Sequence, residues 1–291
     1  MRPEQKAIIE AKNKAGEMTD STMPDKKPRG LILYYSGSGN TRLACRYIAA
    51  NIDSIDFELF NMVGGRIPDL RDYAIVGFAV FTDFLAPPQL VKTYLEKFPV
   101  QQDMPAFVFN TYGFINGKTL KVLADWVGAR GFKVVAGHSL HTPESYPPMV
   151  AGGHGNEQAP NERELKAFKT FVDDLGAVCK RISLKQEVSQ GKIPVGWLYS
   201  VLPTFSRTRS RDDMGIKYVD AELCKECHTC EKLCPYKAII LDPKPVFDMG
   251  KCYGCWSCFN HCPNRAIYTK RYRGRGHYPK PIDQLKEKLA L

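Results

Sequence analysis

The sequence lacks any apolar run that approaches the ~18 residues of a membrane-spanning helix. Its first thirty residues also lack the apolar segment of a secretory leader. Acidic residues are in deficit, because 41 Lys and Arg stand against 31 Asp and Glu, which gives a net charge of +10. These absences predict a cytoplasmic protein without a transmembrane segment, in a compartment where thiols stay reduced.

Cysteine is scarce outside one stretch, since eight of the ten cysteines lie between residues 224 and 262. The other two, Cys45 and Cys179, fall in apolar helical patterns and are predicted to be buried structural thiols. We expect His138, His141 and His154 to be solvated rather than to act as ligands.

The clustered cysteines form two copies of the pattern C-x2-C-x2-C-x3-C-P, at residues 224–235 and 252–263. This spacing is similar to that of bacterial-type ferredoxins, in which the fourth thiolate of each run reaches the other 4Fe–4S cluster. Zinc sites favour paired C-x2-C knuckles with a longer gap, and disulfides need an oxidising compartment, so both alternatives are disfavoured. The predicted ligands are Cys224, Cys227, Cys230 and Cys262 for the first cluster, and Cys234, Cys252, Cys255 and Cys258 for the second.

Strand and helix patterns alternate from residue 31 to residue 182. Short apolar runs predict five strands, at 31–35, 57–60, 73–81, 106–110 and 132–137. Amphipathic patterns predict helices at 41–51, 88–98, 118–129 and 161–182. The alternation predicts an α/β fold with a doubly wound parallel sheet, in which ligands bind beyond the carboxyl ends of the strands.

The loop after the first strand is rich in glycine and small polar residues, namely Ser36, Gly37, Ser38, Gly39, Asn40 and Thr41. The glycines let the backbone approach a ligand, and the polar groups and the following helix N-terminus donate hydrogen bonds to an anion. Arg42 stands where a dinucleotide fingerprint needs its third glycine, and the Gly-Lys-Ser/Thr of a triphosphate loop is missing. The loop therefore predicts a site for one terminal phosphate.

With the predicted sheet around it, this loop resembles the phosphate loop of flavodoxins. Residues 30 to about 269 resemble flavodoxin–ferredoxin fusion proteins, which implies a flavodoxin-like FMN domain followed by a small α+β ferredoxin-like domain with two 4Fe–4S clusters.

The resemblance also implies where the flavin ring lies, between the loops after the third and fourth strands. Its neighbours are then Phe81 or Phe84 and Tyr112, with contacts from Thr111 and Gly113, and the loop 141–148 covers the ring edge. The chain has Ala-Val-Phe81 where a Pro-x-Tyr is expected, and phenylalanine donates no phenolic hydrogen bond. Plain core packing stays open for Phe81 and Phe84.

We expect five segments: a mobile leader (1–29), the FMN domain (30–182), a connector (183–215), the two-cluster ferredoxin domain (216–270) and a basic tail (271–291). Charge collects on the connector and tail, because residues 181–217 carry +4 and residues 264–291 carry +6. Such a field favours redox partner proteins with acidic docking surfaces.

The connector and tail each allow two interpretations. The apolar residues 193–205 are interpreted as a strap packed between the domains, with a docking surface as the alternative. The tail interleaves basic and aromatic residues as nucleic-acid-binding segments do, but we favour a solvated or protein-binding tail over nucleic acid.

Together these features predict an iron–sulfur flavoprotein that relays electrons between two 4Fe–4S clusters and FMN. Two alternatives stay open. One is an FMN-dependent reductase of a small acceptor, with residues 142–156 as a lid, and the other is a redox-responsive regulator that binds nucleic acid. No pyridine-nucleotide fingerprint is present, which argues against oxidation of NAD(P)H by the chain alone. Nothing in the residues indicates an oligomeric state.

Overall fold

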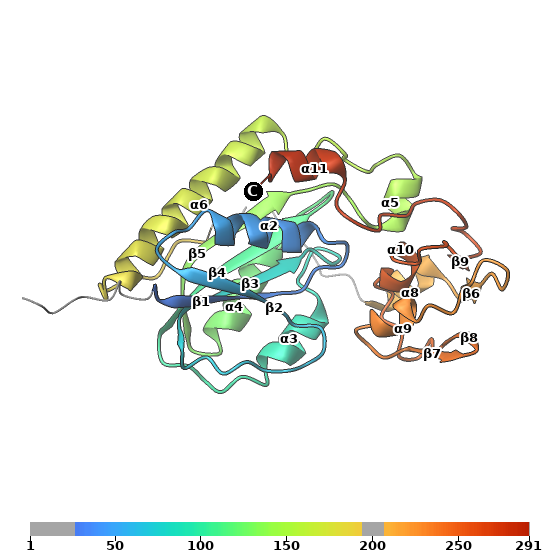
Figure 1. Ribbon diagram of the computed structural model, residues 1–291, viewed down its shortest axis with the longest axis horizontal. Helices are drawn as coiled ribbons and strands as arrows, with labels where there is room; N and C mark the ends of the chain where they lie inside the picture. Colours follow the sequence, from blue (N-terminus) through green and yellow to red (C-terminus); the bar gives the residue numbers. More distant parts are fainter. Residues whose placement is uncertain (1–26, 194–206, 291) are drawn as a thin grey trace, which may run out of the picture.

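The computed structural model describes residues 27–193 and 207–290. Most of the predicted leader, and all but the first residue of the predicted strap at 193–205, lie outside the described residues. In the two described ranges, no helix combines the length and the apolar character needed to cross a membrane. Figure 1 shows a larger part built on a sheet and a smaller cysteine-rich part beyond one end of that sheet.

A five-stranded parallel sheet forms the centre of the larger part, which we call the sheet part. Its strands are β1 (Arg29–Tyr34), β2 (Asp56–Asn61), β3 (Tyr73–Phe81), β4 (Met104–Tyr112) and β5 (Phe132–His141). Their order is β2-β1-β3-β4-β5, with every pair parallel. This is the flavodoxin-like doubly wound order, whose switch point lies between β1 and β3. The predicted fold class and all five predicted strands are confirmed.

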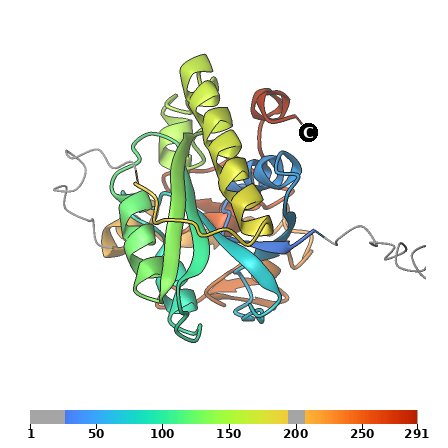
Figure 2. The ribbon, with the colours of Figure 1, turned by 90° about the vertical axis from the view of Figure 1, so that its left-hand side faces the viewer.

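Helices cover both faces of the sheet, as Figures 1 and 2 show. One face carries α2 (Asn40–Ala50) and α6 (Glu162–Ser183), and the other carries α3 (Gln89–Leu95) and α4 (Thr119–Gly128). The α6 helix begins in a capping box, because the Asn161 side chain accepts from the Glu164 N–H while the Glu164 carboxylate accepts from the Asn161 N–H. This sandwich of layers leaves the carboxyl ends of the strands open for a ligand.

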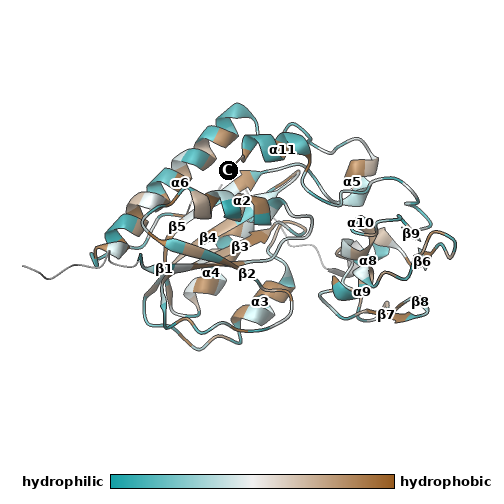
Figure 3. Ribbon diagram, in the orientation of Figure 1, coloured by the Kyte–Doolittle hydropathy of each residue, from teal (hydrophilic) through white to brown (hydrophobic). Residues whose placement is uncertain are grey.

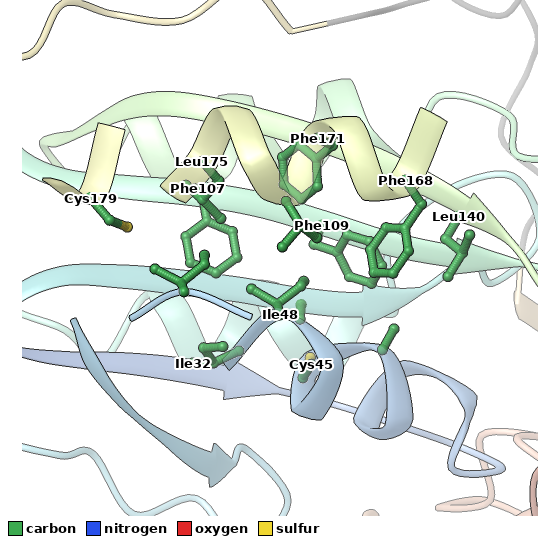
Figure 4. Packing of buried hydrophobic residues seen from close by; sticks show 14 of the residues in the cluster. Ile32, Cys45, Ile48, Phe107, Phe109, Leu140, Phe168, Phe171, Leu175 and Cys179 are labelled. Carbon is green, nitrogen blue, oxygen red and sulfur yellow. The ribbon is translucent and has the colours of Figure 1, made fainter. Parts of the chain in front are cut away.

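The core beneath α2 and α6 follows from the period-two alternation of the strands. On β4, Phe107 and Phe109 face this side, and the Phe109 ring lies 5.7 Å from the ring of Phe168 on α6 (Figure 4). Cys45 and Cys179 are fully buried in the same cluster, which confirms their prediction as buried thiols, and burial raises the pKa of Cys179 to about 12.

The cysteine-rich part consists of two short two-stranded antiparallel sheets and three short helices. Strand β6 (Lys217–Val219) pairs antiparallel with β9 (Ile267–Thr269), and β7 (Ile239–Asp242) pairs antiparallel with β8 (Lys244–Phe247). Its helices are α8 (Arg207–Met214), α9 (Thr229–Lys232) and α10 (Ser257–Asn260), and the last two stand at equivalent places in the two cysteine runs.

The basic tail does not extend into solvent along its whole length, which differs from the solvated or partner-binding tail that its charge predicts. It returns to the sheet part and ends in α11 (Asp283–Lys288), which lies beside α2 and α6 in Figures 1 and 2. Leu285 and Leu289 are buried in the core cluster there, and the Lys288 ammonium donates to the Pro160 carbonyl at 3.0 Å. The outward sides of α6 and α11 are largely hydrophilic (Figure 3).

We expect Leu285→Ala to lower the free energy of unfolding by about 2–5 kcal/mol, because it removes a buried side chain and leaves a cavity under α11. Urea unfolding followed by circular dichroism measures the change. Leu184→Ala is the control, since Leu184 is 59% exposed and should change stability by less than about 0.5 kcal/mol. Equal effects of the two substitutions would show that α11 is not docked.

Candidate functional site

A cavity of about 280 Å³ lies between the carboxyl ends of the strands and the cysteine-rich part. We call it the interdomain cavity. It lies at the switch point between β1 and β3, where doubly wound sheets bind ligands. The structure brings nine of the eleven residues predicted for FMN into its wall: Gly37, Ser38, Asn40, Thr41, Phe81, Phe84, Thr111, Tyr112 and Gly113.

The two other predicted residues, Ser36 and Gly39, do not line the cavity but shape the loop that does. The Ser36 hydroxyl accepts from the N–H groups of Gly39 at 3.1 Å and Arg42 at 3.3 Å, so it closes the turn from within. Gly39 has a backbone φ of +100°, which residues with a side chain rarely adopt. A Cβ added at Gly39 would also lie 2.8 Å from Cδ of Pro281 in the tail. Both residues therefore shape the loop, and their predicted contact with the ligand stays a prediction.

Asn40 and Thr41 brace the loop against the rest of the sheet part. The Thr41 and Thr111 hydroxyls share a hydrogen bond of 2.8 Å, and the Asn40 amide donates to the Pro143 carbonyl at 3.0 Å. The Asn40 side-chain oxygen accepts from the Tyr278 hydroxyl at 3.0 Å. The donors left for an anion are therefore the Ser38 hydroxyl and the backbone N–H groups at the start of α2, where no acidic residue stands in the first turn.

Phe81 and Phe84 are half-buried and form one apolar wall of the cavity. The Phe81 ring packs edge-on against Tyr35 at 5.0 Å. Phe84 and Leu85 both have positive φ, 49° and 69°, so the loop turns sharply at this point. The Phe84 ring meets Tyr146 edge-on at 5.6 Å. Both phenylalanines border the cavity, while Phe81 also packs against the buried core on the face of α3 and α4.

Tyr112 forms another part of the wall and is held by a histidine. Its ring stacks on His141 at 5.0 Å and 4°. The His141 Nε2 donates to the Gly113 carbonyl at 2.8 Å, and Nδ1 lies 3.0 Å from Oε1 of Glu164. His141 therefore supports the Tyr112 ring, whereas the sequence predicted a solvated histidine. His138 also differs from that prediction, because it stacks on a core phenylalanine and burial lowers its pKa to about 4. His154 is exposed, as predicted.

The loop 141–148 after β5, which we call the third loop, borders the cavity, as expected, and contributes the half-buried carboxylate of Glu144. Glu144 Oε1 accepts from the backbone N–H groups of Ser145 at 2.7 Å and Tyr146 at 2.9 Å. Burial raises the pKa of Glu144 despite these two bonds. An added Cβ on Gly113 would lie 2.5 Å from Oε2 of Glu144, so only glycine fits at this point.

Two smaller cavities lie within the cysteine-rich part, and each is bordered by four cysteines. One is lined by Cys224, Cys227, Cys230 and Cys262, and the other by Cys234, Cys252, Cys255 and Cys258. These are the two predicted ligand sets, each with three members from one run and the fourth from the other. We call them the first and second cluster sites.

The backbone of the two runs repeats, and it fits thiolate ligands. His228 and Trp256, which follow equivalent cysteines, have φ values of 58° and 59°. The fourth cysteine of each run accepts a backbone N–H bond from the residue four positions later, from Ala238 at 3.3 Å and from Ala266 at 3.2 Å. Such bonds stabilise negative charge on cluster sulfurs.

Lys217 lies against the second cluster site and is only 7% exposed. Its ammonium nitrogen is 3.1 Å from the Cys252 sulfur. Burial lowers the pKa of Lys217, but the neighbouring thiolates raise it by more, so the net shift of this pKa is upward. The sequence did not predict this contact, because the residues next to Lys217 in the chain do not indicate that it lies near Cys252, 35 positions away.

The second cluster site borders the interdomain cavity. Of the eight cysteines, all of which lie in the described residues, only Cys255 lines this cavity, together with Trp256. Trp256 meets Tyr146 edge-on at 6.2 Å, and the Asn260 amide donates to the Ser145 carbonyl at 3.1 Å. The first site contributes no cysteine to this cavity, and its Cys227 is exposed.

Comparisons with known proteins give separate matches for the cysteine-rich part and for other parts of the chain. The 4Fe-4S binding domain family matches residues 217–240 and 245–268. The pyruvate synthase subunit PorD of Methanocaldococcus jannaschii is 40% identical over 55 residues, which is 18% of this chain and 64% of that subunit. An uncharacterized protein of the same organism, MJ0298, is 25% identical over 150 residues, 50% of this chain and 97% of that protein.

Among solved structures, a flavodoxin from the domain Archaea covers 52% of this chain and 99% of its own, with a TM-score of 0.40 and 17% identity. The strand order by itself defines the sheet part as flavodoxin-like. The chain thus joins a flavodoxin-like fold to a 4Fe–4S binding domain with two cluster sites, which are features of an electron-transfer protein.

Proposed function

We propose that the chain binds one FMN in the interdomain cavity and relays electrons between this flavin and its two 4Fe–4S clusters. The observation that carries the proposal is that Cys255, a cysteine of the second cluster site, lines the same cavity as the loop at the start of α2. Each cluster gains or loses one electron at a time, and FMN supplies the conversion between one- and two-electron transfer.

The donor set of the cavity suits FMN. The Ser38 hydroxyl and the N-terminus of α2 would hold the phosphate, which is an anion. The ring would lie between the wall of Phe81 and Phe84 and the side chain of Tyr112, with the third loop over its edge. Tyr146 and Trp256 would then keep water away from the gap between the flavin and the second cluster site.

The size of the cavity favours a relay over a reductase. Its 280 Å³ lies just below the roughly 300–1,000 Å³ that is usual for ligand pockets. One cofactor would fill this space. The tail forms ion pairs with the cysteine-rich part, Arg271 with Asp213 and Arg273 with Asp220. These ion pairs favour a tail that packs on the protein itself over a tail that binds nucleic acid.

The partner belongs to the same proposal. The exposed end of the first cluster site, around Cys227, carries exposed Leu223 and Leu233 among exposed charges of both signs, Lys225 and Lys232 beside Glu222 and Glu226. A redox protein with an apolar patch and charges that complement both signs would match this face, and acidic groups on it would meet the basic tail. A cytoplasmic location, where thiols stay reduced, is part of the proposal.

Cofactor content tests the proposal. We expect anaerobically purified protein, reconstituted with iron, sulfide and FMN, to hold about eight iron, about eight sulfide and one FMN per chain. Eight iron without flavin would leave a ferredoxin attached to an inactive flavodoxin-like domain, and the proposed relay would be wrong.

A further inference from the structure

The two halves of the cysteine-rich part each carry a lysine on the strand that precedes the cysteine run. Lys217 is on β6 and Lys244 is on β8, and both reach across to the other run. The Lys217 ammonium lies 3.1 Å from the Cys252 sulfur, whereas the Lys244 ammonium donates to the Cys224 carbonyl at 2.9 Å. The internal duplication therefore places one lysine beside each cluster site.

The two lysines differ in their surroundings. Lys244 is 35% exposed and forms an ion pair with Glu226 at 2.8 Å, so its charge is compensated. Lys217 is buried, and among the described residues no carboxylate forms an ion pair with it. The Phe247 ring, centred 5.7 Å from its nitrogen, adds an apolar neighbour. A charge in such an environment is weakly screened and acts strongly on its neighbours.

Without this lysine, the second cluster would be the harder one to reduce. Reduction adds one negative charge to a cluster, and burial disfavours added charge, whereas the first site is open to water at Cys227. A positive charge beside the second site acts in the opposite direction, because it stabilises the reduced state. A hydrogen bond to a cluster sulfur has the same sign.

We propose that Lys217 raises the reduction potential of the second cluster above that of the first, so that an electron accepted at the exposed first cluster moves inward. In that step the first cluster is oxidised by one electron and the second is reduced by one, and no proton is transferred and no bond is broken. The electron comes from a one-electron donor protein at the exposed face. The inward direction rests on the proposed relay, but the order of the two potentials needs only the clusters.

Redox titration of the anaerobic holoprotein, followed by electron paramagnetic resonance of the reduced clusters, tests this order. Lys217→Met is expected to weaken the electron affinity of one cluster at least tenfold, which is a fall of about 59 mV in a one-electron midpoint. Lys217→Arg is expected to restore the midpoint, because it keeps the positive charge. Lys244→Met is the matched control and should move either midpoint by less than half as much.

Cys258→Ala identifies the affected cluster, because the midpoint that remains in this variant belongs to the first cluster and should not respond to Lys217→Met. Equal shifts of both clusters, no shift, or an equal effect of Lys244→Met would overturn the proposal. Iron content is measured first. If Lys217→Met loses iron, Lys217→Gln replaces it, and loss of iron from both variants would make Lys217 a structural residue and refute its role in tuning. A protein without flavin would refute the relay and leave this titration intact.

Discussion

Gly39→Val is expected to lower the affinity for FMN at least 100-fold, which corresponds to about 2.7 kcal/mol, while about eight iron stay bound. Two effects act together. A β-branched residue is strained at a φ of +100°, and strain of this kind costs of order 1–3 kcal/mol. The new side chain would also press on Pro281, 2.8 Å from the added Cβ, and would displace the loop that shapes the cavity.

Fluorescence titration of flavin-free protein with FMN measures the loss. Gly64→Val is the matched control, because Gly64 also has a positive φ, of 117°, but an added Cβ there meets nothing within 4 Å. Pro281→Ala combined with Gly39→Val separates the clash from the backbone strain. Full retention of FMN by Gly39→Val would refute the assignment of the phosphate loop.

Cys258→Ala is expected to remove the second cluster, so that iron falls from about eight to about four per chain. FMN should stay bound, but its reduction through the first cluster within one chain should slow more than tenfold, because the centre beside the cavity is missing. Iron and flavin analysis and the rate of flavin reduction measure the two effects. Cys179→Ala is the control, since Cys179 is equally buried but lies in the core of the sheet part. An unchanged iron content would refute the ligand pairing.

The features that could be predicted from the sequence are those determined by residues close together in the chain. The two cysteine runs fix their ligands through local spacing, and the pairing by which Cys234 joins the second run follows from the known pattern. The strands and helices follow from hydrophobic periodicity, so that β3 was predicted at its observed residues.

The rest depends on contacts between residues far apart in sequence. Nothing local indicates that Tyr278 bonds to Asn40, 238 positions away, or that Trp256 borders the cavity of another domain. The tail was predicted to be solvated or protein-binding from its interleaved basic and aromatic residues, yet Leu285 and Leu289, one turn apart, dock its end on the core. His141 was misjudged for a similar reason, since its partners Gly113 and Glu164 come from other elements.

Electron passage within one chain is tested most directly by anaerobic stopped-flow mixing of the holoprotein with less than one equivalent of a one-electron reductant. Cluster and flavin absorbance are followed together. Because the second cluster site and the flavin would share one cavity, the clusters should be reduced first. FMN should follow in a first-order step whose rate constant does not change with protein concentration. A rate proportional to protein concentration, or clusters that stay reduced beside oxidised FMN, would contradict an internal relay.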